Sequence, residues 1–276
     1  MDISENIHGS LIQHGPHSSR IYLMRLDTKD TRGLITRLDA MALEKGYGKI
    51  FAKIPEPEWH VFKSAGYVKE AVVPKFFEGR TDGYFISKYF NAKRKSEPNE
   101  KNQLSLIGQA GNGLSSPSYR IGRAMRDVVL CTPADAAEMS AIYQKVFKSY
   151  PFPIHRPSYL KRMMSEDVFY YCIRIEGKIA ALAAADVDYT HKNTEMTDFA
   201  TMPEWRSVGL ADMLLVHMDA KARTLGIQTA YTIARMASAG INLVFIKNGY
   251  HYSGLLKNNT QIGGGIESMT VWYKHL

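Results

Sequence analysis

The sequence predicts an α/β protein in which strands and helices alternate around a central sheet. Segments with strand and helix periodicity follow one another through the second half of the 276-residue chain. Segments of the first half also repeat segments of the second half in the same order. A composition of 45% hydrophobic and 22% charged residues is ordinary for a globular protein with a buried core.

The elements of the second half are predicted in the order β-α-α-β-β-β-α-β-α-β. Glu176 and Gly177 form a turn signal between two apolar runs, which predicts a hairpin over 168–188. Apolar residues at 211, 214, 215, 218, 222 and 225 have the helical period, and Gly226 ends that helix. The remaining predictions are strands near 127–131 and over 194–202, 227–236 and 267–276, and helices over 133–147, 155–167 and 239–247.

The first part of the chain resembles the second in reduced form. "LDAMALEKG" at 38–46 parallels "MDAKARTLG" at 218–226, and "VFKSAGY" at 61–67 parallels "VFIKNGY" at 244–250. The helix of the first copy follows two acids, at positions 27 and 30, which would repel an anion. We therefore predict a degenerate, non-catalytic half over 1–92. The polar, turn-rich segment 93–119 is predicted to be a linker, and 120–276 the functional domain.

Charge and composition limit the classes of partner. The net charge of +8 fits a nucleic acid, a membrane surface or a phosphate-bearing small molecule, and equally a solvated basic surface. The longest apolar run, which begins at Ile179, meets an acid after seven residues and is too short to span a bilayer. The first ten residues are polar, so no signal peptide is expected and a cytoplasmic location is predicted.

Cysteine and histidine residues give no sign of a metal site. Cys131 and Cys172 lack ligand-like spacing and are predicted to be reduced core thiols. His8, His14 and His17 are unevenly spaced and are predicted to be exposed to solvent, so no metal is expected. The glycine pattern "GQAGNG" at 108–113 is rejected as a phosphate loop because "LSSPS" follows it and cannot start a helix at once.

The segment "EWRSVGLADMLL" at 204–215 begins a helix without the usual acidic or hydroxyl cap. It has the pattern R-x-x-G-x-A, in which Arg206 is followed by Gly209 and Ala211, and its first acid inside the helix is Asp212. Backbone N–H groups of about 207–211 point out of the first turn, and the small side chains let phosphates approach them. The pattern predicts a site for a diphosphate.

This loop and the order of elements around it resemble the acetyl-CoA-binding core of the Gcn5-related N-acetyltransferase superfamily, from about Val128 to the C-terminus. The resemblance implies the acyl-CoA N-acyltransferase fold, with a mixed, mostly antiparallel sheet flanked by helices, and acetyl-CoA as co-substrate. In that fold the strand before the loop diverges from the next strand, and pantetheine pairs with its backbone. The cofactor-binding residues that this implies in the strand and loop are Phe199, Ala200, Thr201, Met202, Arg206, Ser207, Val208, Gly209, Leu210 and Ala211.

The helix after "YTIARM" is similar to the second motif of that superfamily, N-x-x-A-x-x-x-Y-x-K-x-G-F. Ser238 stands at the asparagine position, Phe245 at the tyrosine position and Lys247 at the lysine position. These three residues and Asn242 complete the implied cofactor site. Phe245 cannot protonate a departing thiolate as tyrosine does. Either the thiolate, with a pKa of about 8.5, leaves without an acid, or a tyrosine at 250 or 252 supplies the proton.

Acetyl transfer to an amine requires a base, because a lysine-type amine with a pKa of about 10.4 is protonated at neutral pH. Glu195 precedes Arg206 by eleven residues, the spacing at which some members of the superfamily place a catalytic glutamate. Glu195 and Asp198 face opposite sides of a strand unless a bulge intervenes, so we expect one of them to face the reacting centre. Glu195 is predicted to be the base, and Asp198 a base or a clamp for an ammonium group.

Five segments resemble one subgroup, the β-lysine N6-acetyltransferases: "SYPFPI", "EMTDFATMPEWR", "YTIARM", "NGYHYSGLLKNNTQIGGG" and "ESMTVWYK". The resemblance implies acetyl transfer to the side-chain (N6) amine of β-lysine, (3S)-3,6-diaminohexanoate, to make the compatible solute N6-acetyl-β-lysine. Arg235 would bind the carboxylate of this substrate, and Asp198 or Glu267 its second ammonium. Tyr150, Phe152 and Trp272 would line its methylene chain.

Three alternatives stay open at this point. The acceptor is another primary amine, such as α-lysine, a polyamine or a protein amino group. A second alternative is a CoA-sensing module without catalysis. The third is nucleic-acid binding through basic segments at 91–95 and 119–126, which lack interleaved aromatic residues. The partners predicted are acetyl-CoA and a small amino acid, without nucleic acid or membrane, and a homodimer is compatible with these features.

Overall fold

The computed structural model describes residues 2–112 and 127–276, whose strands form one sheet. The strand order is β1-β2-β3-β4-β6-β5-β12-β13-β11-β10-β9-β8-β7, and only β3–β4 and β10–β11 are parallel neighbours. The strands are β1 (Ile3–Ile7), β2 (Ser10–Gly15), β3 (Arg20–Arg25), β4 (Lys49–Pro55), β5 (Val68–Phe77), β6 (Thr81–Tyr89), β7 (Val128–Leu130), β8 (Val168–Ile175), β9 (Lys178–Asp188), β10 (Asn193–Thr201), β11 (Thr229–Arg235), β12 (His251–Ile262) and β13 (Gly265–His275). The mixed, mostly antiparallel sheet flanked by helices confirms the predicted fold class.

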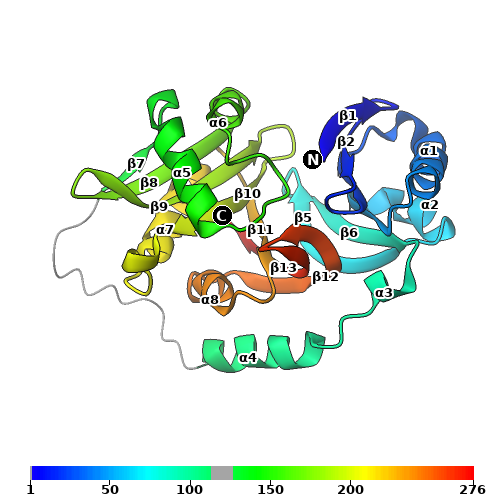
Figure 1. Cartoon of the computed structure of the whole chain (residues 1–276). Helices are drawn as coiled ribbons and strands as arrows, with labels where there is room; N and C mark the ends of the chain where they lie inside the picture. The colour runs from blue at the N-terminus through cyan, green and yellow to red at the C-terminus, as the bar shows by residue number, and fades with distance from the viewer. Residues whose placement is uncertain (1, 113–126) are drawn as a thin grey trace.

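Helices cover both faces of the sheet in the second half (Figure 1). The α-helices are α1 (Thr31–Glu44), α2 (Trp59–Ser64), α3 (Ala92–Lys95), α4 (Glu100–Asn112), α5 (Ala136–Val146), α6 (Pro157–Met164), α7 (Leu210–Thr224) and α8 (Ala239–Lys247). Short 3-10 helices occupy η1 (Thr28–Asp30), η2 (Glu56–Glu58), η3 (Pro133–Asp135) and η4 (Pro203–Trp205). None of the described helices is long and apolar enough to cross a membrane.

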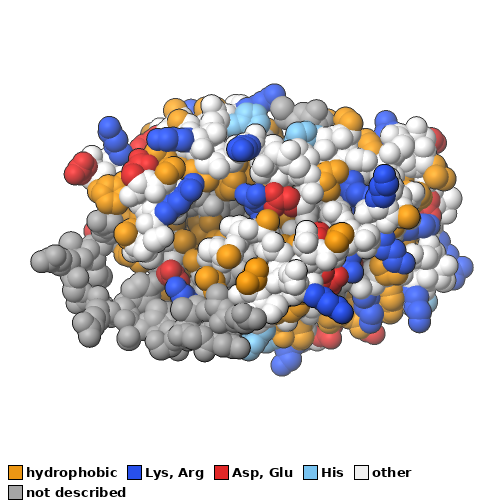
Figure 2. Space-filling view, turned by 60° about the horizontal axis from the view of Figure 1, so that its bottom comes forward, with side chains coloured by type: hydrophobic (Ala, Val, Ile, Leu, Met, Phe, Trp, Pro, Cys, Tyr) orange, Lys and Arg blue, Asp and Glu red, His pale blue; other side chains and the backbone are white. Residues whose placement is uncertain are grey.

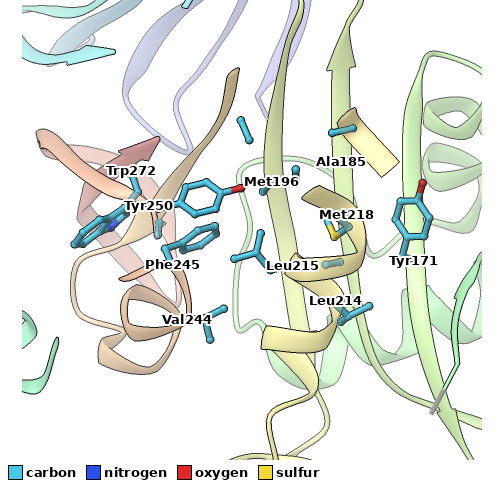
Figure 3. Packing of buried hydrophobic residues seen from close by; sticks show 14 of the residues in the cluster. Tyr171, Ala185, Met196, Leu214, Leu215, Met218, Val244, Phe245, Tyr250 and Trp272 are labelled. Carbon is cyan, nitrogen blue, oxygen red and sulfur yellow. The ribbon is translucent and has the colours of Figure 1, made fainter. Parts of the chain in front are cut away.

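Strand β8 shows why two helical layers form. Tyr171 and Ile173 belong to the core under α7, whereas Tyr170 and Cys172 belong to the core under α5 and α6. This alternation is the period of two that a strand imposes on its side chains. From α7, Leu214, Leu215 and Met218 reach the sheet and meet Val244 and Phe245 of α8 (Figure 3).

The two halves of the chain share one arrangement of strands. The order β2-β3-β4-β6-β5 has the same sequence of antiparallel and parallel pairings as β9-β10-β11-β13-β12. Segment 38–46 contains the C-terminal end of α1, and segment 218–226 contains that of α7. In the same way, segment 61–67 contains the C-terminal end of α2, and segment 244–250 contains that of α8. The sequence matches therefore lie at equivalent places in the two halves.

Strands β5 and β12 join the halves into one sheet, with Gly254 opposite Ala71. A shared apolar core lies across this junction: Phe76 and Phe85 of the first half pack with Tyr231, Leu256 and Val271 of the second. The halves are consequently packed against each other through side chains as well as through backbone pairing.

The structure corrects three expectations from the sequence. Strand β12 was not predicted, because bulges near 252–254 and 256–260 and a polar run at 257–260 hide its alternation. The predicted linker contains α3 and α4, and Ile107 of α4 is buried in the core with α7 and α8. His14 is buried, not exposed, and contacts Tyr47 and Glu5. Residues 113–126, with the rest of the linker and the start of the predicted second domain, lie outside the described residues.

Cys131 and Cys172 are both buried and form no disulfide, as the sequence predicts. His8 is exposed.

The close approach of β5 and β12 gives a first prediction. A Cβ atom added at Gly254 would lie 2.1 Å from the carbonyl oxygen of Glu70 and 2.8 Å from Cα of Ala71. Gly254→Val is therefore expected to lower the free energy of unfolding by about 1–3 kcal/mol, measured by urea denaturation. Gly265→Ala is the control, because nothing lies within 4 Å of a Cβ at that position. Equal stability of the two variants would contradict the described approach of the strands.

Candidate active site

A cavity of about 1000 Å³ is lined by residues of both halves of the chain. The second half contributes the first turn of α7, the facing edges of β10 and β11, and the start of α8. The first half contributes side chains of β3 and β4. The cavity therefore brings the N-terminus of a helix, several carboxylates and several cationic groups to one place.

The diverging strands β10 and β11 form one wall of this cavity. They pair only at Asn193–Glu195, opposite Thr229–Tyr231, although β10 continues to Thr201 and β11 to Arg235. Residues of both strands beyond the paired part line the cavity. The backbone groups on these facing edges can bind an extended molecule that lies between the strands.

The loop before α7 holds two residues in the left-handed region, Ser207 at φ 63° and Gly209 at φ 83°. Gly209 is the N-cap of α7 and adopts this conformation without a Cβ clash, whereas Ser207 is strained. In the part of the chain that the structure describes, no side chain caps this helix end. The amides of the first turn are available to a ligand, and the helix dipole favours an anion there.

The equivalent helix of the first half, α1, has a different N-terminus. Asp30 is its N-cap, and Oδ1 of Asp30 accepts a hydrogen bond from N–H of Gly33 at 2.9 Å. A carboxylate therefore occupies the place that an anionic ligand would take. The sequence-based distinction between the two helix starts is consistent with this geometry.

The predicted cofactor residues fall into two groups. Those that line the cavity are Phe199, Thr201, Arg206, Ser207, Gly209, Leu210, Ala211, Ser238 and Lys247. Ala200, Met202, Val208, Asn242 and Phe245 are not among the described lining residues. Asp212, in the first turn of α7, also lines the cavity; its carboxylate accepts a hydrogen bond from Asn248 at 3.0 Å, and burial raises its pKa.

Asn242 and Phe245 support the wall from behind. Nδ2 of Asn242 donates to the carbonyl oxygens of Arg235 and Ser238, at 2.9 and 2.8 Å, and so fixes the turn from β11 into α8. The ring of Phe245 is fully buried and packs edge-on against Phe199, with ring centroids 5.6 Å apart. Both residues therefore lie behind the cavity wall and hold residues of that wall in position.

Glu195 lies at the point where β10 and β11 separate. The hydroxyl of Tyr231 donates to Oε2 of Glu195 at 3.0 Å and accepts from Nζ of Lys53 at 2.7 Å. Burial raises the pKa of Glu195, while the charge of Lys53 and the hydrogen bond from Tyr231 oppose that rise. The carboxylate is thus held in a defined position beside a cation from the first half.

Asp198 faces the same cavity because β10 contains a bulge. The register shifts between Thr197 and Ala200, and Asp198 itself has φ 56°. The bulge named as the exception to opposite faces is therefore present, and Glu195 and Asp198 both line the cavity. Oδ1 of Asp198 accepts from the hydroxyl of Tyr150 at 2.5 Å, and burial raises the pKa of Asp198 to about 6.

Asp186 of β9 is a third carboxylate on the cavity wall, and the sequence analysis did not select it. Its side chain is accessible to solvent through the cavity, and the surrounding protein atoms together with the neighbouring charge of Glu195 raise its pKa to about 6. Its only sequence signal is that it interrupts an apolar strand, and an acid at such a position usually has a specific role.

The predicted substrate residues are partly brought together. Tyr150, Phe152 and Arg235 line the cavity. Arg235 and Glu267 bind each other through two hydrogen bonds of 2.9 and 2.5 Å, so each already has its countercharge. Trp272 is buried in the core, where its Nε1 donates to Oδ1 of Asn242 at 2.9 Å. It is not among the described lining residues.

The two tyrosines considered as replacement acids also lie elsewhere. The hydroxyl of Tyr250 donates to Asp219 at 2.7 Å in the core, and Tyr252 packs edge-on against Trp272. Neither is among the described residues that line the cavity. The described structure therefore does not place either hydroxyl in the cavity, where a leaving group would need its proton.

The sequence predicted no site residue in the first half of the chain. Arg20, Tyr22, Met24, Phe51 and Lys53 line the cavity. Each is an ordinary member of a strand in the sequence, and only the pairing of β5 with β12 brings β3 and β4 to the second half. No local pattern could have identified them.

The arrangement is suited to removing a proton from a bound amine next to an anion-binding helix end. No group of three or more described His, Cys, Asp or Glu side chains is placed to hold a metal ion. The carboxylates and backbone amides are the reactive features of this site.

Comparisons with known proteins agree with this chemistry. Residues 137–242 match the acetyltransferase (GNAT) family. The chain is 37% identical over 268 residues to the β-lysine N(6)-acetyltransferase of Methanococcus maripaludis, with 97% of each chain covered. It is 28% identical over 262 residues to the enzyme of the same name from Methanosarcina mazei, covering 87% of this chain and 95% of that one. It is 24% identical over 272 residues to the N-acetyltransferase YodP of Bacillus subtilis, covering 97% and 96%.

The raised pKa of Asp198 predicts an effect on stability. Because the folded state binds this proton more tightly than the unfolded state, ionisation of Asp198 lowers the free energy of unfolding as pH rises from about 4 to 6. Asp198→Asn should therefore be more stable than the wild type at pH 7, and the difference should shrink towards pH 4, in urea denaturation at both pH values.

Asp188→Asn is the matched control. Burial raises the pKa of Asp188, but hydrogen bonds from His191 outweigh this and lower it overall. This substitution should therefore destabilise the protein at pH 7. A loss of stability in Asp198→Asn at pH 7 would show that burial is not the dominant influence on the pKa of Asp198.

Proposed function

Because the chain belongs to the GNAT family of acetyltransferases, we propose that it transfers acetyl from acetyl-CoA to the N6 amine of β-lysine, (3S)-3,6-diaminohexanoate. The product would be the compatible solute N6-acetyl-β-lysine. The observation that supports this most is the single cavity that joins the uncapped N-terminus of α7 to Glu195, Asp198 and Asp186. The relative from Methanococcus maripaludis, similar over both halves, supports the choice of acceptor.

The residues around the α7 terminus fit acetyl-CoA. The free first-turn amides after Gly209 and the exposed Arg206 would hold the diphosphate. The unpaired edge of β10 at 199–202 would bind the pantetheine backbone, with Ser238 and Lys247 on the opposite side of the cleft. When bound, acetyl-CoA supplies the thioester on which the acceptor amine acts. No metal is needed for this reaction.

The base must remove a proton from the acceptor amine. Removing a proton from an amine with a pKa of about 10.4 at pH 7 costs about 4.6 kcal/mol. We assign this proton to Glu195, which accepts it directly or through water, while Asp198 acts as a second base or binds an ammonium group. Tyr231 and Lys53 hold Glu195 in place. The departing thiolate, with a pKa of about 8.5, leaves without an enzyme acid.

Lys and Arg side chains are spread over the face seen in Figure 2, between neutral and acidic side chains, without forming one basic stripe. A nucleic-acid partner would need such a stripe. We propose a cytoplasmic enzyme of osmolyte synthesis without nucleic-acid or membrane partners, with the homodimer as a further proposal.

A thiol-release assay tests the acceptor. With acetyl-CoA, the wild-type chain should acetylate β-lysine with a kcat/KM at least ten times that for α-lysine or a polyamine, because buried polar groups of a site are left unpaired when a substrate lacks the matching group. Product mass should show one acetyl group, and fragmentation of the product should place that group on N6. Preference for another amine would overturn the β-lysine assignment, and tight acetyl-CoA binding without any turnover would favour the sensing module.

Substitution of the carboxylates tests the base. Glu195→Gln should lower kcat/KM by about 10² to 10⁴-fold. The wild-type kcat/KM should fall as pH decreases through about 6, because protonated Asp198 can neither accept a proton nor bind an ammonium. In Asp198→Asn this acid limb should weaken or move to lower pH. Glu204→Gln, an exposed acid before the loop, is the control. Wild-type kcat/KM in Glu195→Gln would exclude Glu195 as the base.

A further inference from the structure

Arg20 of β3 is a buried cation that lines the cavity without a carboxylate partner among the described residues. Its side chain belongs to a residue that is only 4% exposed. Nη1 donates to the carbonyl oxygen of Asn259 at 3.0 Å, and Nη2 lies 3.5 Å from Oε1 of Gln13. A buried guanidinium without a countercharge is costly, and a ligand carboxylate would offset that cost.

Arg235, which the sequence predicted to bind the substrate carboxylate, already has an acid as its partner. It already binds Glu267 through both Nε and Nη2. A substrate carboxylate at Arg235 would have to displace or repel that acid. Of these two cavity arginines, Arg20 is the one whose charge is not neutralised by a paired acid.

Aromatic side chains and Lys53 lie between Arg20 and Glu195. Its Cζ lies 5.1 Å from the ring centroid of Tyr22, and Nζ of Lys53 lies 5.6 Å from the same centroid. Lys53 in turn contacts Tyr231, which binds Glu195. Arg20 and Glu195 therefore line the same cavity and are linked by a chain of contacts through Tyr22, Lys53 and Tyr231.

A second unpaired group lies next to Arg20. Asn259 of β12 is 1% exposed and lines the cavity, and its Oδ1 has no hydrogen-bond partner in the described structure. Buried amide oxygens are normally paired. A guanidinium without an acid and an amide oxygen without a donor match a ligand that brings both a carboxylate and an ammonium.

We propose that Arg20, from the first half of the chain, binds the carboxylate of the acceptor amino acid and so determines the preference for diamino acids over diamines. This inference rests on the proposed function for the reaction, but it makes the first half part of the acceptor site. Asn259 receives the ammonium that neighbours this carboxylate, and the reacting amine at the other end of the substrate reaches Glu195.

The test compares each amino acid with the diamine that lacks only its carboxylate. The pairs are β-lysine with 1,4-diaminopentane and α-lysine with 1,5-diaminopentane. Arg20→Gln should lower kcat/KM for the amino acid of the preferred pair by about 10- to 100-fold, mainly through KM, because a charged hydrogen bond is lost. The value for the diamine should change less than about threefold. Arg20→Lys, which keeps the charge but not the fork, should give an intermediate loss.

Arg94→Gln is the matched control. Arg94 is also buried, and it donates to carbonyl oxygens of Asn258, Ser18 and Ser19, but it is not among the described lining residues. Its substitution should leave the ratio between amino acid and diamine unchanged. Unfolding curves of all variants establish that the proteins compared are folded.

The outcomes separate the two proposals. If the wild type prefers α-lysine, the β-lysine assignment fails, and the α-lysine pair decides the role of Arg20. If Arg20→Gln lowers kcat/KM equally for amino acid and diamine, the role of Arg20 in carboxylate binding is overturned. If only Arg20→Lys folds, an equal loss for amino acid and diamine in that variant overturns it. A wild type that acetylates only diamines overturns it as well.

Discussion

The pairing of β5 with β12 is the constraint on which the rest of the structure depends. Beneath it, Nζ of Lys49 donates to Oε2 of Glu70 and to the carbonyl oxygen of Lys257, both at 2.8 Å, and N–H of Lys257 donates to Oε1 of Glu70 at 2.8 Å. The hydroxyls of Ser87 and Tyr89 also bind Glu70. Burial lowers the pKa of Lys49 to about 8, yet every charge here has a partner, which such a buried pair requires. This network fixes the register in which the two halves meet.

Two irregularities in the sheet of the second half then create the site. The separation of β10 from β11 after Glu195 opens a cleft, and the bulge at Asp198 turns a second carboxylate into it. A regular parallel pair would have closed the cleft and placed Asp198 on the other face. Glu195, Asp198 and the unpaired edge therefore all belong to β10, which explains why the two carboxylates lie beside that edge.

The first half has the same arrangement of strands as the second but a different N-terminus on the equivalent helix. Asp30 caps α1 and fills the position where α7 leaves its amides free. Arg20 of β3 and Lys53 of β4 line the cavity that both halves share. The first half thus forms part of the wall of a cavity that the second half also lines.

The sequence by itself determined the alternation of elements, the repeat, the uncapped start of α7 and the candidate carboxylates, because periodicity, helix capping and residue chemistry are local properties. It did not reveal β12, whose bulges hide its period, and it gave no sign that Asp198 would turn through a positive φ to join Glu195. Nor did it indicate Arg20, Lys53 or Asp186, which are unremarkable in their own strands. Only the tertiary structure decided these points, since long-range strand pairing determines which side chains share a cavity, and no local pattern encodes it.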